Sequence, residues 1–196
     1  MDKIMRKAEI RRETNETDIY VSIQLDGKGI AEIDTGIGFF DHMLMLMAFH
    51  GKFDMKVKCH GDTYVDDHHT IEDIGIALGQ CVKGALGDRC GIKRYSTVFI
   101  PMDEALAQTS IDVSNRPYLV FNAEFADERV GNMATQMVKE FFRAFVNESR
   151  VTLHINLLYG ENDHHKIEAI FKSFARALKD AIKIISDEVA SSKGVL

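Results

Sequence analysis

Two segments of the chain carry the same potential metal ligands at the same spacing. The pattern His-His-x-x-Glu occurs at His68, His69 and Glu72, and again at His164, His165 and Glu168. On an α-helix successive side chains are ~100° apart, so the first histidine and the glutamate of each copy share a face. Adjacent histidines point in different directions and cannot easily bind the same ion. Two copies therefore favour a site for two metal ions with mixed imidazole and carboxylate ligands.

One copy alone would be a weak signal, because histidine pairs at helix N-termini are often only solvated. Repetition at matching places in the chain strengthens it. Further ligands are expected from the helix before each copy, namely His42 before His68 and Glu140 before His164. His42 has another interpretation as a helix N-terminal histidine without function. Glu140 has another interpretation as a carboxylate on a solvated helix face.

The donor atoms restrict the choice of metal. Nitrogen and oxygen ligands without thiolate disfavour a structural zinc–cysteine site and suit octahedral Mn²⁺, with Fe²⁺, Co²⁺ and Zn²⁺ as competitors. Cys59, Cys81 and Cys90 show no paired spacing. We therefore expect buried thiols that fill the core in a reducing compartment.

The motifs belong to a longer internal repeat. Residues 63–80 match 159–176, residues 39–51 match 137–149, and residues 16–23 can be laid over 104–111. We infer a first half over residues 1–92 and a second half over 93–185, which form one compact unit. Residues 186–196 are expected to form a flexible C-terminal tail.

Hydrophobic periodicity predicts four strands and two helices in each half. In the first half the expected strands are 10–14, 19–26, 30–34 and 55–59, and the expected helices are 40–50 and 67–86. In the second half the expected strands are 97–101, 105–113, 118–125 and 152–158, and the expected helices are 135–147 and 163–187. The predicted fold class is α+β, with an antiparallel or mixed sheet in each half and the two helix layers packed between the two sheets.

Composition excludes several classes of function. The net charge of −6 over 196 residues argues against a general nucleic-acid binder, which needs a basic face. No apolar run approaches membrane-spanning length, and the N-terminal residues lack the apolar core of a signal peptide. We therefore expect a cytoplasmic protein with no membrane and no nucleic-acid partner.

Seven motifs follow one another over nearly the whole chain: residues 12–17 (RETNET), 35–44 (TGIGFFDHML), 66–73 (DDHHTIED), 101–104 (PMDE), 115–118 (NRPY), 162–168 (NDHHKIE) and 191–196 (SSKGVL). In these motifs and their order the sequence resembles the imidazoleglycerol-phosphate dehydratase family in its single-function form. The resemblance implies a duplicated fold like domain 2 of ribosomal protein S5, two Mn²⁺ ions per active site at subunit interfaces, and a homo-oligomer of twenty-four subunits.

The metal ligands that the resemblance implies are His42, His68, His69, Glu72, His164, His165 and Glu168. Many relatives have a histidine ligand where this chain has Glu140. Either the glutamate replaces that histidine or the metal has one protein ligand fewer.

The implied reaction is the dehydration of imidazole glycerol phosphate to imidazole acetol phosphate in histidine biosynthesis. The proton to be removed is not activated by a carbonyl, so a metal-bound imidazolate and a diazafulvene-like intermediate are the expected route. Glu16, in the turn between the first two strands, is the expected acid/base and substrate contact, with Glu104 as the runner-up.

The substrate phosphate needs cations or backbone donors. The family's phosphate-binding positions correspond to Arg94, Arg116, Lys172, Ser191, Ser192 and Lys193, and His50 is a further candidate substrate contact. The Ser-Ser-Lys of the tail is expected to become ordered over bound substrate.

Two other classes of function are also compatible with the His-His-x-x-Glu motifs taken alone. A di-metal hydrolase would use a metal-bound hydroxide and release no keto product. A metal-storage or metal-organised assembly would bind Mn²⁺ without turnover and would not need the phosphate-binding set.

Overall fold

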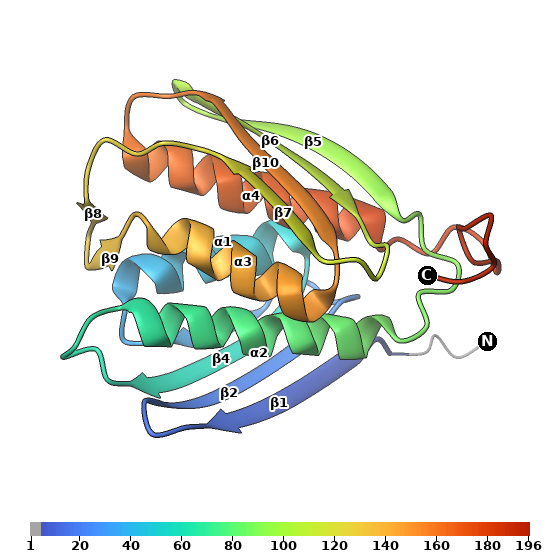
Figure 1. The fold of residues 1–196 in the computed structure, drawn as a ribbon, viewed down its shortest axis with the longest axis horizontal. Coiled ribbons are helices and arrows are strands. Elements are labelled where there is room, and N and C mark those ends of the chain that lie inside the picture. The colour runs from blue at the N-terminus through green and yellow to red at the C-terminus, as the bar shows by residue number, and fades with distance from the viewer. Residues whose placement is uncertain (1–4) are drawn as a thin grey trace.

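Two four-stranded sheets form the outer layers of the structure and four helices fill the space between them (Figure 1). The computed structural model describes residues 5–196. This is the predicted α+β fold with helix layers between two sheets.

The first sheet contains β1 (Lys7–Glu13), β2 (Thr17–Gln24), β3 (Ala31–Asp34) and β4 (Asp54–Gly61) in the order β1-β2-β4-β3. The strands are antiparallel except for the parallel pair β3 and β4. Its two helices are α1 (Gly38–Gly51), which connects the parallel strands, and α2 (His68–Leu86), which follows β4.

The second sheet repeats this arrangement. It contains β5 (Tyr95–Met102), β6 (Ala105–Asp112), β7 (Tyr118–Asn122) and β10 (Thr152–Tyr159) in the order β5-β6-β10-β7, again with one parallel pair, β7 and β10. Its helices are α3 (Met137–Ser149) and α4 (Asp163–Ala181). The same order of strands and helices in both halves is what an internal duplication produces.

Alternating burial along the strands fixes which face of each sheet meets the helices. In β2 the side chains of Ile19, Val21 and Ile23 are buried, while the residues between them are only half-buried. β6 shows the same alternation. A strand whose apolar residues recur with period two buries one face, so both sheets turn their apolar faces inward.

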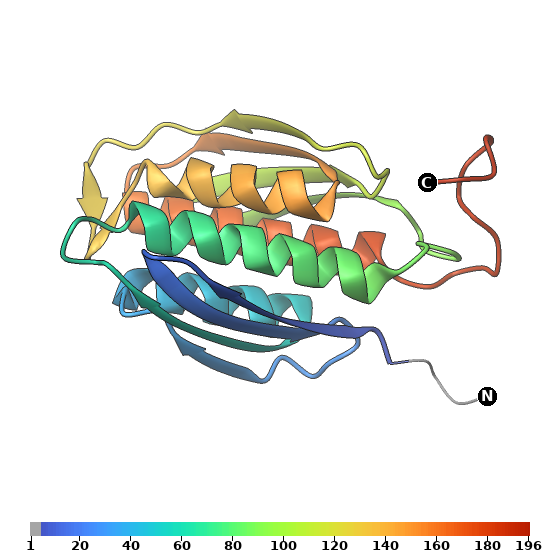
Figure 2. The same cartoon turned by 60° about the horizontal axis from the view of Figure 1, so that its bottom comes forward.

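Between the sheets, α2 packs against α3 and α1 packs against α4 (Figure 2). Gly79 allows the close approach of α2 and α3, because a Cβ atom there would lie 2.6 Å from the carbonyl oxygen of Phe145. Gly75 allows the same approach about one turn earlier in α2, where a Cβ would lie 2.8 Å from the carbonyl oxygen of Phe141. The phenylalanines of α3 also pack on Phe171 and Phe174 of α4.

A small hairpin that the sequence did not predict links β7 to α3. It consists of β8 (Arg129–Val130) and β9 (Met133–Ala134). The carboxylate of Asp67 accepts hydrogen bonds from the Ala134 amide and from Arg129, and so ties the hairpin to the start of α2. Asp163, the first residue of α4, accepts a hydrogen bond from the Asp127 amide in the same connection.

The predicted end of the last helix, at Asp187, is wrong by six residues. α4 ends at Ala181, whose carbonyl oxygen accepts a hydrogen bond from the Arg94 amide. Beyond it Ile184 forms an isolated antiparallel bridge with Ile92. Pairing with the segment between the two halves therefore replaces the helical hydrogen bonds that the apolar pattern suggested.

Candidate active site

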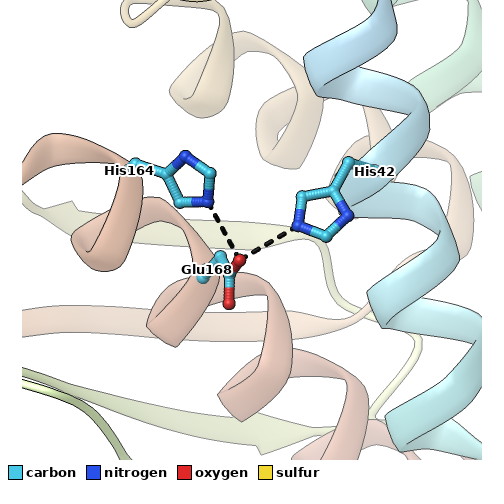
Figure 3. Close-up of side chains that lie close together, drawn as sticks. All are labelled: His42, His164 and Glu168. Atoms are coloured by element: carbon cyan, nitrogen blue, oxygen red, sulfur yellow. Dashed lines mark hydrogen bonds and ion pairs between the residues drawn. The ribbon is translucent and has the colours of Figure 1, made fainter.

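His42, His164 and Glu168 form a cluster between the two halves of the chain (Figure 3). Glu168 Oε1 lies 3.0 Å from Nε2 of His42 and 3.0 Å from Nε2 of His164. One ligand atom from each of the three residues can be chosen so that all lie within 4.8 Å of one another. It is the only group of three or more possible ligands gathered in this way among residues 5–196.

Helix geometry and helix packing assemble this cluster. His164 and Glu168 stand at i and i+4 in the first turns of α4, where Asn162 caps the helix by accepting a hydrogen bond from the His165 amide. His42 lies near the start of α1, which packs on α4. The Phe39 ring meets the His164 ring edge-on at 5.0 Å between centroids and restricts its position.

The Glu168 carboxylate is buried and held in its ionised form. Burial alone would raise its pKa, but hydrogen bonds from Lys172, His42 and His164 outweigh that effect and lower the pKa to about 2. An ionised carboxylate oxygen between two imidazole nitrogens is a donor set that Mn²⁺, Fe²⁺, Co²⁺ or Zn²⁺ accepts. The residues present therefore fit a divalent metal ion.

The first copy of the motif is more open. His68 Nε2 lies 3.6 Å from Glu72 Oε2 on α2, and the His68 side chain is about as exposed as those of His42 and His164, whereas Glu72 is far more exposed than Glu168. Glu140, on the neighbouring α3, forms an ion pair with Arg143 instead of joining a three-ligand group. The structure thus keeps Glu140 on the helix that packs against the first copy but leaves its carboxylate paired with a cation.

His69 and His165, the second histidine of each copy, stand outside the cluster and contact carboxylates. His69 Nδ1 lies 3.0 Å from Asp62 Oδ2, and His165 Nδ1 lies 2.8 Å from Glu104 Oε2. These hydrogen bonds raise the pKa of each histidine. Neither contact was inferred from the sequence, because both depend on how the loops fold.

The two acid/base candidates have different surroundings. Glu16 lies in the β1–β2 turn with its side chain 52% exposed, and its Oε1 is 3.7 Å from His69 Nε2. Glu104 has both oxygens occupied, because Oε1 accepts from the amides of Glu161 and Asn162 and Oε2 from His165. These bonds lower the pKa of Glu104 to about 2, which makes it a weak base.

One group of phosphate candidates lies at the start of β5, just after β6 and in the C-terminal segment. Arg94 is buried, donates to Asp112 Oδ1 at 2.7 Å and also donates to the carbonyl oxygen of Ala190 at 2.7 Å. Arg116 is exposed, 3.6 Å from Asp112. Ser191 Oγ accepts from the Lys193 amide at 3.2 Å, in a turn that also contains Ser192. Arg94 therefore brings the segment that carries Ser191, Ser192 and Lys193 to the second sheet.

The other group lies near Glu168. Lys172 pairs with Glu168 and, with His50, lines a surface depression of about 700 Å³. Arg176, one turn after Lys172, lines it too and was missed, although its i+4 spacing from Lys172 was a usable signal. Burial, together with the nearby Lys172 and Arg176, lowers the pKa of His50.

The two groups are separated along α4. The Arg94 amide donates to the carbonyl oxygen of Ala181, which lies nine residues after Lys172. Because a helix rises ~1.5 Å per residue, Lys172 and Ala181 are roughly 13 Å apart along the α4 axis. The structure does not bring Lys172 and Arg94 together within one chain.

Thiols take no part in these clusters. Cys59 and Cys81 are buried, as the sequence predicted, and burial raises the pKa of each thiol to about 12. Both are therefore protonated at neutral pH and are poor ligands. Cys90 is partly exposed, so the prediction of a buried thiol is wrong at that position.

The chain is similar to known proteins in sequence and in fold. A family model described as imidazoleglycerol-phosphate dehydratase matches residues 35–178. The dehydratase of Clostridioides difficile (strain 630) is 69% identical over 192 residues, which cover 98% of this chain and 100% of the relative. That of Caldicellulosiruptor saccharolyticus is 56% identical over 191 residues, with coverage of 97% and 98%.

Two solved structures agree with these matches. The imidazoleglycerol-phosphate dehydratase of Staphylococcus aureus superposes with a TM-score of 0.83 at 44% identity, over 91% of this chain and 99% of that one. The enzyme of Pyrococcus furiosus, solved in complex with (S)-C348, gives a TM-score of 0.84 at 40% identity, over 95% and 100%.

The fold and its relatives define a carbon–oxygen hydro-lyase with a candidate metal site. More particularly, the chain belongs to the imidazoleglycerol-phosphate dehydratase family. This membership supports a dehydration of imidazoleglycerol phosphate, a step of histidine biosynthesis. Within residues 5–196, none of the helices combines the length and apolar character that a membrane span requires.

Proposed function

We propose that this chain dehydrates imidazoleglycerol phosphate to imidazole acetol phosphate and uses two Mn²⁺ ions per active site. The observation that carries the proposal is the convergence of His42 and His164 on one oxygen of the buried, ionised Glu168. A family member needs a way to activate an imidazole ring, and nitrogen and oxygen ligands of this kind suit Mn²⁺.

His42, His164 and Glu168 would hold one ion. His68 and Glu72 would hold the second, with Glu140 on the adjacent helix as a further ligand once it releases Arg143. When bound, the ions supply Lewis acidity towards the nitrogen atoms of the substrate's imidazole ring.

His69 and His165 support metal sites that are shared between subunits. The Nε2 atoms of His69 and His165 are only weakly engaged, 3.7 Å from Glu16 and Asp103, and lie on another face of their helices from His68 and His164. We assign them to ions whose other ligands come from neighbouring subunits. This arrangement requires a homo-oligomer, for which we propose twenty-four subunits in the cytoplasm.

Glu16 is the acid/base of the proposal. Its carboxylate is half exposed. The 3.7 Å separation of Glu16 Oε1 from His69 Nε2 is too long for a hydrogen bond, so this contact does not keep Glu16 from the substrate. Glu16 would accept the proton from the side-chain carbon one bond from the carbon that loses its hydroxyl. Glu104 is less suited to this task, because backbone amides and His165 already occupy both of its oxygens.

Two groups of cationic and hydrogen-bonding residues would bind the phosphate from different subunits. Arg94 and Arg116, with Ser191, Ser192 and Lys193, form one group, and Lys172 with His50 forms the other. Their separation along α4 within one chain supports this division. The C-terminal segment, residues 186–196, would close over the substrate from its attachment at Arg94.

Native mass spectrometry of the purified full chain tests the metal and assembly aspects of the proposal together. We expect a particle of twenty-four copies of the 22.1 kDa chain that carries two tightly bound ions per chain after exposure to Mn²⁺. A monomer that binds two ions would contradict shared sites, and an oligomer that retains no Mn²⁺ would contradict the metal assignment.

A further inference from the structure

Each half of the chain contains a histidine held between two carboxylates. In the first half, Asp62 lies at Nδ1 of His69 at 3.0 Å, and Glu16 lies at Nε2 at 3.7 Å. In the second half, Glu104 lies at Nδ1 of His165 at 2.8 Å, and Asp103 lies at Nε2 at 3.7 Å. The contact at Nδ1 is in each case a hydrogen bond, and the contact at Nε2 is not.

The acids that contact Nδ1 come from different places. Asp62 follows β4 and precedes α2, whereas Glu104 lies in the turn between β5 and β6. The repeat places Leu158 where the first half has Asp62, so that position has no acid in the second half. Glu104, the counterpart of Glu16 in the repeat, supplies the carboxylate at Nδ1 instead. Both halves thus make the same contact with a carboxylate from a different source.

A carboxylate at Nδ1 determines which ring nitrogen is free. Neutral imidazole has one N–H and one acceptor nitrogen, and a carboxylate accepts but cannot donate. The proton therefore resides on Nδ1, and Nε2 presents its lone pair on the opposite side of the ring. Histidine ligands of metals are commonly oriented in this way, and the orienting partner contributes about 10–100-fold to metal affinity.

We propose that Asp62 and Glu104 are positioning residues that fix the tautomer and ring orientation of His69 and His165, so that each presents Nε2 to a divalent metal ion. This inference rests on the proposed function, in which both histidines are ligands. In this inference Glu104 is not the acid/base. Its carboxylate orients His165 and does not contact the reacting atoms of the substrate.

Glu104→Gln separates orientation of the histidine from support of the loop. Glu104 Oε1 accepts from the amides of Glu161 and Asn162, so the amide oxygen of glutamine can keep both bonds. Its NH₂ group then faces His165 Nδ1, which must become the acceptor and leave the proton on Nε2. The variant therefore keeps the loop contacts, but the proton on Nε2 of His165 prevents that nitrogen from binding a metal ion.

Asp62→Asn is the matched variant in the other half. Both Asp62 oxygens lie near His69 Nδ1, at 3.1 and 3.0 Å, so asparagine can still turn its oxygen to that nitrogen. The same chemical change should therefore cost much less here, less than about tenfold, because only the charge of the acceptor is lost. Glu161→Gln is the control, since its exposed side chain lies in the same loop as the Glu104 contacts.

The experiment is a titration of the metal-free full chain with Mn²⁺, followed by the electron paramagnetic resonance signal of the free ion, with thermal unfolding of each metal-free variant beside it. We expect Glu104→Gln to weaken binding at one class of site by about 10–100-fold, while the metal-free variant still unfolds cooperatively with a Tm lowered only by the loss of the carboxylate's charge. Asp62→Asn should weaken binding less, and Glu161→Gln should match the wild type.

Equal affinity in Glu104→Gln and the wild type would overturn the positioning role while leaving the metal sites in place. Equal losses in Glu104→Gln and Glu161→Gln would also overturn it, because the effect would then belong to the charge of the loop. A wild-type chain that binds no Mn²⁺ would overturn the proposed function as well as this inference. Asp62→Asn, compared with Asp62→Ala, gives the same test if Glu104→Gln does not fold, since only alanine removes the acceptor.

Discussion

His42 and Glu168 are 126 residues apart in the chain, yet His42 Nε2 lies 3.0 Å from Glu168 Oε1. The two residues belong to α1 and α4, one helix from each half of the duplicated fold. Neither half contains the cluster by itself, so packing of the two halves is what creates the candidate metal site.

Replacing Glu168 by glutamine should remove the stabilisation that comes from the Mn²⁺ ion held by His42, His164 and Glu168. A ligand that binds only the folded state adds about 2.7 kcal/mol at a concentration of about 100 Kd. We expect Mn²⁺ to raise the Tm of the metal-free wild type, and to raise that of Glu168→Gln less, because only the second ion still binds. Differential scanning calorimetry with and without Mn²⁺ measures both. Glu124→Gln, at an exposed site, is the control, and an undiminished shift in Glu168→Gln would exclude Glu168 as a ligand.

Replacing Glu16 by glutamine should slow turnover strongly without loss of metal. Glutamine keeps the size of the side chain but cannot accept a proton, and acid–base groups contribute about 10²–10⁴-fold to rate. We expect kcat to fall by that factor while Mn²⁺ content and Tm stay at wild-type values. Steady-state kinetics with metal analysis measure this. A near-normal kcat with both ions in place would show that a residue other than Glu16 is the acid/base.

Arg94 and Arg116 should respond differently to substitution by glutamine. Arg94 is buried and donates to Asp112 and to the carbonyl oxygen of Ala190, so Arg94→Gln removes these charged hydrogen bonds and should cost about 2 kcal/mol in the free energy of unfolding. Arg116 is largely exposed, so Arg116→Gln should raise KM with little change in stability. Urea unfolding and steady-state kinetics on the two variants distinguish these effects. A stability loss in Arg116→Gln equal to that in Arg94→Gln would contradict the assignment.

Alanine at Gly79 should push α2 and α3 apart. The added methyl group would meet the Phe145 carbonyl oxygen at 2.6 Å, and overpacking of this kind costs about 1–3 kcal/mol. Gly84, on the same helix, is the matched control, because a Cβ there meets only the Ala8 side chain at 3.3 Å. Gly84→Ala should be close to neutral in chemical unfolding. Equal effects at the two positions would mean that helix propensity, not the contact with α3, decides the result.

The sequence predicts the architecture and the ligand-bearing helices well, for physical reasons. Alternating apolar residues identify strands such as β2, and the repeated His-His-x-x-Glu pattern locates the starts of α2 and α4. The hairpin of β8 and β9 was not predicted, because strands of two residues carry no periodic signal.

Spatial partners are harder to infer than elements. Chain order associates His42 with the motif at His68, but the packing of α1 on α4 places it beside His164 and Glu168. Asp62 reaches His69 only through the fold of the loop before α2. The end of α4 was missed for the same reason, since pairing of Ile184 with Ile92 is a contact between distant segments.

Turnover of imidazole glycerol phosphate by the purified, Mn²⁺-reconstituted chain, with a chelated sample beside it, tests the proposed dehydration most directly. We expect formation of the keto product, imidazole acetol phosphate, which stops when the metal is chelated and returns when Mn²⁺ is restored. Two ions bound per chain with no keto product would contradict the proposed dehydration.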